Sequence, residues 1–370
     1  MNCILKVFSR FPATHPKVKR VFALRIHNIM AAAAGDRIKI GTHDGTFHCD
    51  EVFACYMLKT LPAYKNAEII RSRKPEILET CDIVVDVGGV YSPDTHRYDH
   101  HQREFAHTMN TLRPEKKWTT KLSSAGLVYL HFGHRVIEQA FKTLAIDLSP
   151  EKLERFYDKM YEMFVEEIDA VDNGVDQYET GGKPRYAVTT TIGSRIGHLN
   201  PRWNEKEVDI TKRFNKAMDL VGGEFMDRLE YFVKGWWPAR TIVESAFEKR
   251  FQVDDSGEIV VLMQGGCPWK DHLFTIEEEQ GIEGTTKFFL FADQNGNWRV
   301  QCVPIVLGSF ENRLSLLEEW RGIRDDELSK ISGIPGCIFV HASGFIGGNK
   351  TYEGVLEMAR KTLAKSKNGC

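Results

Sequence analysis

The stretch Arg37-Ile-Lys-Ile-Gly-Thr-His-Asp-Gly-Thr-Phe-His-Cys-Asp-Glu51 holds the first structural unit of the chain and its densest group of chemically active side chains. Polar and apolar residues alternate over 37–42, which is typical of a half-buried β-strand. A polar loop follows as far as Cys49, and residues 51–61 then show the apolar periodicity of a helix. The stretch therefore predicts a strand, a loop and a helix in succession.

The same order of elements recurs further along the chain. Residues 67–73 form a short β-rich run, residues 75–79 suit a helix that begins with proline, and residues 82–87 are a nearly continuous apolar run. Long helical patterns then cover residues 123–144 and 150–173. This alternation predicts an α/β domain with a parallel sheet and helices on both faces.

The chain is predicted to have three regions. Residues 1–35 are a separate basic segment, residues 36–185 form the α/β domain, and residues 186–370 hold a linker and a smaller domain. The linker is placed in the turn-rich stretch 174–204. The C-terminal domain is predicted to be mixed α/β, from helical patterns over 208–235 and 238–251, strand-like runs over 259–263, 287–292 and 298–305, and a final strand and helix over 338–340 and 352–364.

The composition excludes several classes of protein. With 370 residues, 42% of them hydrophobic and 27% charged, the chain is neither disordered nor fibrous. Its net charge of -2 gives no overall positive field, so a nucleic acid would have to be held locally. The eight cysteines contain no CxxC pair and are interpreted as reduced thiols. No apolar run approaches the roughly 20 residues that cross a bilayer, so no membrane is expected among the partners.

Residues 1–35 carry no acidic side chain, and their basic residues alternate with apolar ones from Lys17 to Met30. This pattern is typical of a mitochondrial targeting segment without fixed structure. A disordered basic tail, or a short nuclear signal over 16–20, remains open, and Met30 could start a shorter form. The six basic residues are Lys6, Arg10, Lys17, Lys19, Arg20 and Arg25.

Histidines and aspartates follow the predicted strands of the first domain, at the sheet edge where ligands of open α/β sheets bind. His43, His48 and Asp50 come after the first strand, although Asp50 could equally cap the following helix. Asp86 interrupts the apolar run 83–87, where a carboxylate must be paired or bind a metal. These two segments are ambiguous when each is taken alone.

Two further segments carry the same residue types. The triplet Asp99-His100-His101 places an aspartate where it can orient an imidazole. Asp172 shares a helical stripe with Phe156, Met160, Phe164 and Ile168, so it is expected to point inward. Three other acids of this helix are interpreted as a solvated face: Glu166, Glu167 and Asp169.

Taken together, the four segments predict a two-metal site. Its ligands are oxygen and imidazole nitrogen without thiolate, which favours Mn²⁺ or Mg²⁺ over structural zinc. Two such ions activate a water molecule and stabilise the oxyanions of a phosphate ester during in-line attack. The sequence thus favours a phosphoesterase.

Longer motifs carry a family resemblance. The order of motifs is similar to that of the DHH phosphoesterase superfamily, and the chain from about Arg37 almost to the C-terminus resembles the melanocyte proliferating gene family. That family implies a metal-dependent 3′–5′ exonuclease acting on single-stranded RNA in the mitochondrial matrix and in the nucleus or nucleolus. The motifs are Gly41-Thr-His-Asp-Gly-Thr-Phe-His-Cys-Asp-Glu51, Val84-Val-Asp-Val-Gly-Gly89, Tyr98-Asp-His-His-Gln-Arg103, Val165-Glu-Glu-Ile-Asp-Ala-Val-Asp-Asn-Gly174 and Gly336-Cys-Ile-Phe-Val-His-Ala-Ser-Gly-Phe-Ile-Gly-Gly348.

The resemblance also implies roles for individual residues. His101 would act on the scissile phosphate as proton donor or charge stabiliser, and Asp99 would orient its neighbour. The first loop departs from the superfamily pattern because His48 stands where aspartate is usual. Six residues would be the metal ligands: His43, His48, Asp50, Asp86, His100 and Asp172.

The second domain contains a glycine-rich segment that is predicted to join a strand to a helix and to contact phosphate through backbone amides and Lys350. The C-terminal domain associated with the wider superfamily usually ends this segment in histidine, whereas Asn349 stands here. The predicted substrate-binding residues are Arg313, His341, Gly344, Gly347, Gly348, Asn349 and Lys350.

Two alternatives to the RNA exonuclease remain open. The same metal site would serve hydrolysis of short oligonucleotides, cyclic dinucleotides or pyrophosphate. The other hypothesis is a non-catalytic RNA-binding module, although the complete set of candidate ligands disfavours it. The oligomeric state is open, with a homodimer as one option.

Overall fold

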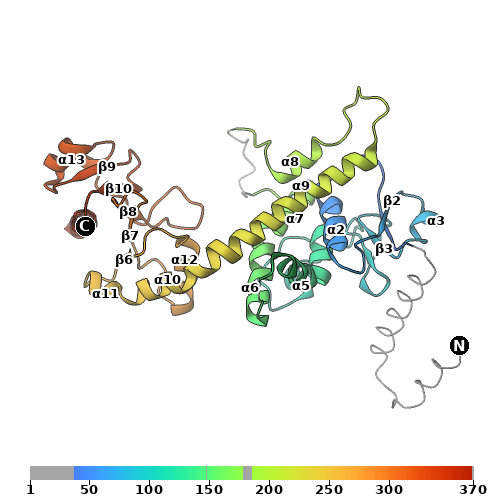
Figure 1. The fold of residues 1–370 in the computed structure, drawn as a ribbon, viewed down its shortest axis with the longest axis horizontal. Helices are drawn as coiled ribbons and strands as arrows, with labels where there is room; N and C mark the ends of the chain where they lie inside the picture. Colours follow the sequence, from blue (N-terminus) through green and yellow to red (C-terminus); the bar gives the residue numbers. More distant parts are fainter. Residues whose placement is uncertain (1–36, 147, 178–185, 369–370) are drawn as a thin grey trace, which may run out of the picture. The chain divides into compact units, whose positions relative to one another are not determined.

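The computed structural model describes residues 37–146, 148–177 and 186–368, which divide by their contacts into two compact units (Figure 1). The first ends at Leu229 and the second begins at Glu230. The structure is mixed α/β with two sheets, as predicted. The predicted targeting segment, 1–35, lies outside the described residues. Within the described part, no helix is both long and apolar enough to span a membrane.

The first sheet is parallel apart from one edge strand. Its order is β2-β1-β3-β5-β4; β1, β2, β3 and β5 run parallel, and β4 pairs antiparallel with β5. Because the carboxyl ends of the parallel strands share one edge, the loops that follow them converge there. The strands are β1 (Lys39–Thr42), β2 (Glu68–Arg71), β3 (Ile83–Val85), β4 (Tyr91–Ser92) and β5 (Arg97–Tyr98).

Helices complete the first unit, with α2 packed against α5. The helix predicted over 150–173 is divided by a π-helical turn, η2 (Tyr161–Val165). The helix after the turn-rich stretch also belongs to this unit, because Phe225 on α9 packs 5.3 Å from the ring of Phe53. The helices are α2 (Cys49–Thr60), α3 (Pro75–Leu78), the 3-10 turn η1 (Pro93–Thr95), α4 (Met109–Leu112), α5 (Ser124–Leu144), α6 (Pro150–Met160), α7 (Glu166–Asp172), α8 (Ile192–Gly197) and α9 (Ile210–Tyr231).

A buried carboxylate on α7 holds the N-terminus of α5. Asp169 is fully buried, and its Oδ1 accepts hydrogen bonds from the Ser123 backbone N–H (2.9 Å), the Ser123 hydroxyl (2.7 Å) and the Gly126 N–H (3.0 Å). Its Oδ2 accepts one from the Tyr161 hydroxyl at 2.9 Å. Burial raises the pKa of Asp169 to about 7, against these hydrogen bonds, which lower it. The prediction of a solvated Asp169 was wrong, because it assumed α-helical spacing through η2.

Replacing Asp169 with alanine is expected to lower the free energy of unfolding by about 3 kcal/mol or more, since two backbone amides and a tyrosine hydroxyl would lose their buried acceptor. Denaturant unfolding of the full chain measures this. Glu138→Ala, an exposed acid on α5, is the control and should stay within about 0.5 kcal/mol of the parent. A loss below about 1 kcal/mol for Asp169→Ala would contradict the anchoring role.

The second unit is built on a sheet with helices on both faces. Its order is β6-β7-β8-β10-β9, in which only β6 and β7 pair in parallel. Side chains alternate along β6, because Ile259 and Val261 join one hydrophobic cluster with α13 and α14, whereas Val260 and Leu262 join another with α10 and α12. The elements are β6 (Ile259–Leu262), β7 (Phe288–Ala292), β8 (Trp298–Cys302), β9 (Cys337–Val340), β10 (Ile346–Asn349), η3 (Phe232–Trp236), α10 (Trp237–Glu248), α11 (Arg250–Val253), α12 (Lys270–Gln280), η4 (Glu318–Trp320), α13 (Asp325–Ser332) and α14 (Tyr352–Asn368).

The glycine-rich segment of this unit is partly a turn, which contains Gly344, and partly a strand, β10. β10 pairs with β8 on one side and β9 on the other, so sheet partners occupy it on both sides. A Cβ on Gly347 would lie 2.9 Å from both Leu316 Cδ1 and Met358 Cε. Asn349 is fully buried, donates from Nδ2 to the Pro335 carbonyl at 2.9 Å and accepts from the Thr351 N–H at 3.0 Å. Gly347 and Asn349 therefore have close packing roles in this strand, and the phosphate contacts expected of the segment stay a prediction.

Candidate metal centre

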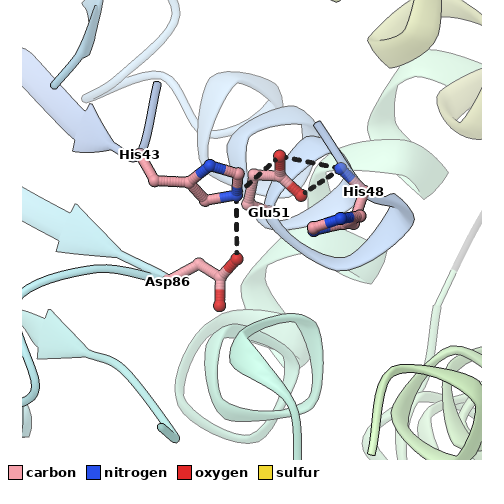
Figure 2. Close-up of side chains that lie close together, drawn as sticks. All are labelled: His43, His48, Glu51 and Asp86. Carbon is pink, nitrogen blue, oxygen red and sulfur yellow. Dashed lines mark hydrogen bonds and ion pairs between the residues drawn. The ribbon is translucent and has the colours of Figure 1, made fainter. Parts of the chain in front are cut away.

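The loop after β1 and the first turn of α2 supply four of the polar side chains. Both carboxylate oxygens of Glu51 lie 2.9 Å from the backbone N–H of His48, which caps the start of α2. The same carboxylate lies 3.1 Å from His43 Nε2 through Oε1. Figure 2 shows His43 between Glu51 and Asp86, with His48 on the other side of Glu51. Asp50, beside Glu51 in this turn, is fully buried.

Asp86 directly follows β3 and adopts a left-handed backbone conformation, with φ of 61°. Such a conformation costs a non-glycine residue of order 1–3 kcal/mol. It is held by the Asp86 N–H, which donates to the Tyr98 carbonyl at 3.1 Å, and by the Ser124 hydroxyl, which donates to Asp86 Oδ1 at 3.0 Å. The result is a carboxylate between two histidines: Oδ2 lies 3.3 Å from His43 Nε2, and Oδ1 lies 3.4 Å from His100 Nε2.

His100 faces a group of carboxylates. Its Nε2 lies 3.1 Å from Asp172 Oδ2 and 4.0 Å from Asp50 Oδ2. Among the described residues, neither oxygen of Asp50 and neither ring nitrogen of His100 has a hydrogen-bond partner with proper geometry. Buried polar atoms without partners are costly. Divalent cations coordinated by these oxygens and nitrogens would satisfy them, so the residues present fit a metal.

The electrostatics of the cluster show an excess of negative charge. Burial disfavours protonation of His43, but the carboxylates of Asp86 and Glu51 raise its pKa to about 10. Burial also disfavours protonation of His100, but the carboxylates of Asp172 and Asp86 raise its pKa to about 9. Burial, together with the charges of Asp86, Asp172 and Glu51, raises the pKa of Asp50 above its ordinary value. The site therefore attracts positive charge, as a cation site must.

The side chain of His101 lies at the surface of this cluster and is 61% exposed. Asp99 is its partner. Its Nδ1 lies 2.7 Å from Asp99 Oδ1. Asp99 is fixed in turn by the Gly89 N–H, which donates to Oδ2 at 2.6 Å, and by the His100 N–H, which donates to Oδ1 at 2.8 Å. The hydrogen bond from Asp99 raises the pKa of His101. Asp99 thus keeps a proton on Nδ1 and leaves Nε2 as the nitrogen for other contacts.

The six predicted ligands come together in the structure, and Glu51 joins them. Asp86 and His100 each belong to two groups and so link the cluster. Glu51 was given no ligand role from the sequence; its place three residues after His48, typical of a capping box, was the available signal. Within each group the potential ligand atoms lie within 4.8 Å of one another: His43, His48, Glu51 and Asp86; Asp86, His100 and His101; Asp50, His100 and Asp172.

Two cavities reach this cluster, and both are lined by His48, Asp86 and His101. The larger, about 640 Å³, has a polar lining that includes Arg73 and Gln102. The smaller, about 430 Å³, is lined half by apolar residues and glycines, most of them from the end of α7 and from α8, and half by polar and charged residues.

The predicted substrate-binding residues of the second unit make contacts within that unit. Arg313 forms a buried ion pair with Glu277, with Nη1 2.7 Å from Oε2, so its charge is already neutralised. His341 Nδ1 lies 2.9 Å from the Ser343 hydroxyl. Gly344 occupies the β9–β10 turn with φ of 73°, which suits glycine. Lys350 is exposed.

A family model and several relatives match most of the chain. The family model MYG1_exonuc, described as "Uncharacterised protein family (UPF0160)", matches residues 39–363. The MYG1 exonuclease of Bos taurus is 59% identical over 327 residues, covering 88% of this chain and 85% of that protein. The MYG1 exonuclease of Rattus norvegicus is 58% identical, with the same shares covered. A crystal structure of an uncharacterized Helicobacter pylori G27 protein aligns at 12% identity over 89% of this chain and 99% of that one, with a TM-score of only 0.22.

Proposed function

Since the chain belongs to the MYG1 exonuclease family, we propose that it is a metal-dependent exonuclease that degrades single-stranded RNA from the 3′ end. One observation carries the metal dependence: Asp50 is fully buried with both oxygens lacking a hydrogen bond, beside an Asp86 held in an unfavourable backbone conformation. Family membership supports exonuclease action. RNA and the 3′–5′ direction are the further steps of the proposal.

Two Mn²⁺ or Mg²⁺ ions are proposed to be held by His43, His48, Asp50, Asp86, His100 and Asp172. When bound, such ions activate water and neutralise charge on the phosphate. Asp86 positions His43 and His100 through its two oxygens, and Ser124 fixes the direction of that carboxylate. The Asp99 carboxylate orients His101, which then donates a proton or a hydrogen bond to the scissile phosphate through Nε2.

The test is a time course with single-stranded RNA labelled at its 5′ end, incubated with the full chain and Mn²⁺. We expect a descending ladder that EDTA abolishes and added Mn²⁺ restores. Intact RNA would contradict RNA degradation and direct attention to short oligonucleotides, cyclic dinucleotides and pyrophosphate. A protein with a net charge of -2 has no overall positive field that would favour a long polyanion over these small substrates. A ladder that persists in EDTA would contradict the metal dependence.

The place of action is proposed to be the mitochondrial matrix and the nucleus or nucleolus. Residues 1–35 support this, with six basic and no acidic side chains.

A further inference from the structure

The smaller cavity beside the metal centre has the chemistry of a nucleoside site. One part of its lining is apolar, with Phe47, Ile168, Val171 and Ile192, and another part carries the carboxylates of Asp86, Glu167 and Asp172. Val171 is 60% exposed, so apolar surface is uncovered at its edge. The volume of about 430 Å³ falls within the range of small-molecule sites, about 300–1,000 Å³. A flat, uncharged base on its sugar suits such a lining better than a phosphate does.

The larger cavity has the opposite character. Arg73 lines it, paired with Asp44 at 2.6 Å and with a side chain 58% exposed, together with the backbone of Gly88 and Gly89. Three carboxylates complete the polar lining: Asp86, Asp99 and Glu104. The guanidinium of Arg73 suits a phosphate, whereas the Gly89 N–H already donates to Asp99. Because His48, Asp86 and His101 line both cavities, a phosphate at these residues has Arg73 in one cavity and a group of apolar side chains in the other.

We infer that the cavity between residues 46–49, the end of α7, and α8 seats the terminal nucleoside of the RNA, while the rest of the strand follows the Arg73 cavity. The inference rests on the proposed function. It places a single nucleoside beyond the scissile phosphate, which limits the enzyme to removing one nucleotide at a time. Glu167, at the edge of the nucleoside cavity, offers a carboxylate to the hydroxyl groups of the terminal ribose.

Gly193 on α8 leaves the space that this site needs. A Cβ there would lie 4.0 Å from both Cys49 Cβ and Val171 Cγ1, an ordinary van der Waals distance, so the position faces two residues that line the cavity. Helix α8 is fixed by Thr191, whose hydroxyl accepts the Ser194 N–H at 3.2 Å. A leucine at Gly193 would therefore enter the cavity without displacing the backbone.

The test compares Gly193→Leu with the parent on two RNAs, one ordinary and one whose 3′-terminal nucleotide lacks its base. Burying one base contributes about 1–3 kcal/mol, so the parent should prefer the ordinary RNA by roughly 5- to 150-fold. In Gly193→Leu this preference should fall to about twofold or less. The control, Gly223→Leu on α9, where a Cβ meets no atom within 4 Å, should keep the parent's preference.

A binding measurement separates this inference from the proposed function. Calorimetric titration with AMP in the presence of Mn²⁺ should show binding to the parent and at least a tenfold weaker affinity for Gly193→Leu, with Mn²⁺ binding retained. This holds even if RNA is not degraded. Parental AMP affinity in Gly193→Leu, or no AMP binding to the parent, would overturn the inference. Glu167→Ala is the second variant: it should lose discrimination between a ribose and a 2′-deoxyribose at the 3′ end, and retained discrimination would remove Glu167 from the site.

Discussion

Replacing Asp86 with asparagine is expected to lower RNA degradation by about a thousandfold or more while leaving the fold intact. The carboxylate has one oxygen toward His43 and the other toward His100, and asparagine replaces one of them with an amide that cannot bind a cation. Asparagine tolerates the left-handed backbone that Asp86 adopts, so the substitution tests chemistry rather than folding. Initial rates on labelled RNA and denaturant unfolding measure the two effects.

The control for Asp86→Asn is Asp219→Asn, which makes the same chemical change at an exposed position on α9. It should retain the parent's rate. An active Asp86→Asn protein would remove Asp86 from the set of metal ligands.

The second large effect is expected from Asp50→Asn. This substitution should lower activity and raise the stability of the metal-free protein. Without metal, the free energy of unfolding should rise by about 1–3 kcal/mol, because a fully buried carboxylate near Asp86, Asp172 and Glu51 is replaced by a neutral group of the same shape. Since the folded pKa of Asp50 is raised, the parent should lose stability as pH rises above about 4, the ordinary aspartate value, and the variant should lose less.

Metal reverses the comparison for Asp50. Mn²⁺ should raise the melting temperature of the parent and have a much smaller effect on Asp50→Asn, whose RNA degradation should be largely lost. Melting curves of both proteins with EDTA and with Mn²⁺ measure this. A metal-free Asp50→Asn protein that is less stable than the parent, or one that Mn²⁺ stabilises equally, would exclude Asp50 as a ligand.

The candidate ligands could be predicted from the sequence because each local signal pointed to the same place. His43, Asp86 and His100 follow β1, β3 and β5, and parallel strands present their carboxyl ends at one edge. Asp172 was predicted from apolar neighbours four residues apart. These inferences required only the order of elements, the direction of strands and the spacing of apolar residues along one helix.

Residues whose role depends on distant partners could not be predicted in this way. Arg313 has the side chain of a typical anion-binding residue. Only the fold places it against Glu277, 36 positions away in the chain. Gly347 and Asn349 could belong to a phosphate loop or to a tightly packed strand, and the difference lies in Leu316 and Met358, which no local pattern connects to them. Asp169 was missed because a π-helical turn has no clear sequence signature.

That turn, η2, sets the angle at which α7 presents its acids. Phe156 and Asp172 are sixteen residues apart. In a regular α-helix, their side chains would therefore point in directions about 160° apart around the helix axis. One extra residue taken up in a π-helical turn removes about 100° of this rotation. The angular phase of the helix, rather than a further side chain, thus brings Asp172 to His100 while Asp169 faces α5. A chain one residue shorter between 161 and 165 would keep every ligand in its sequence and lose the alignment of the last one.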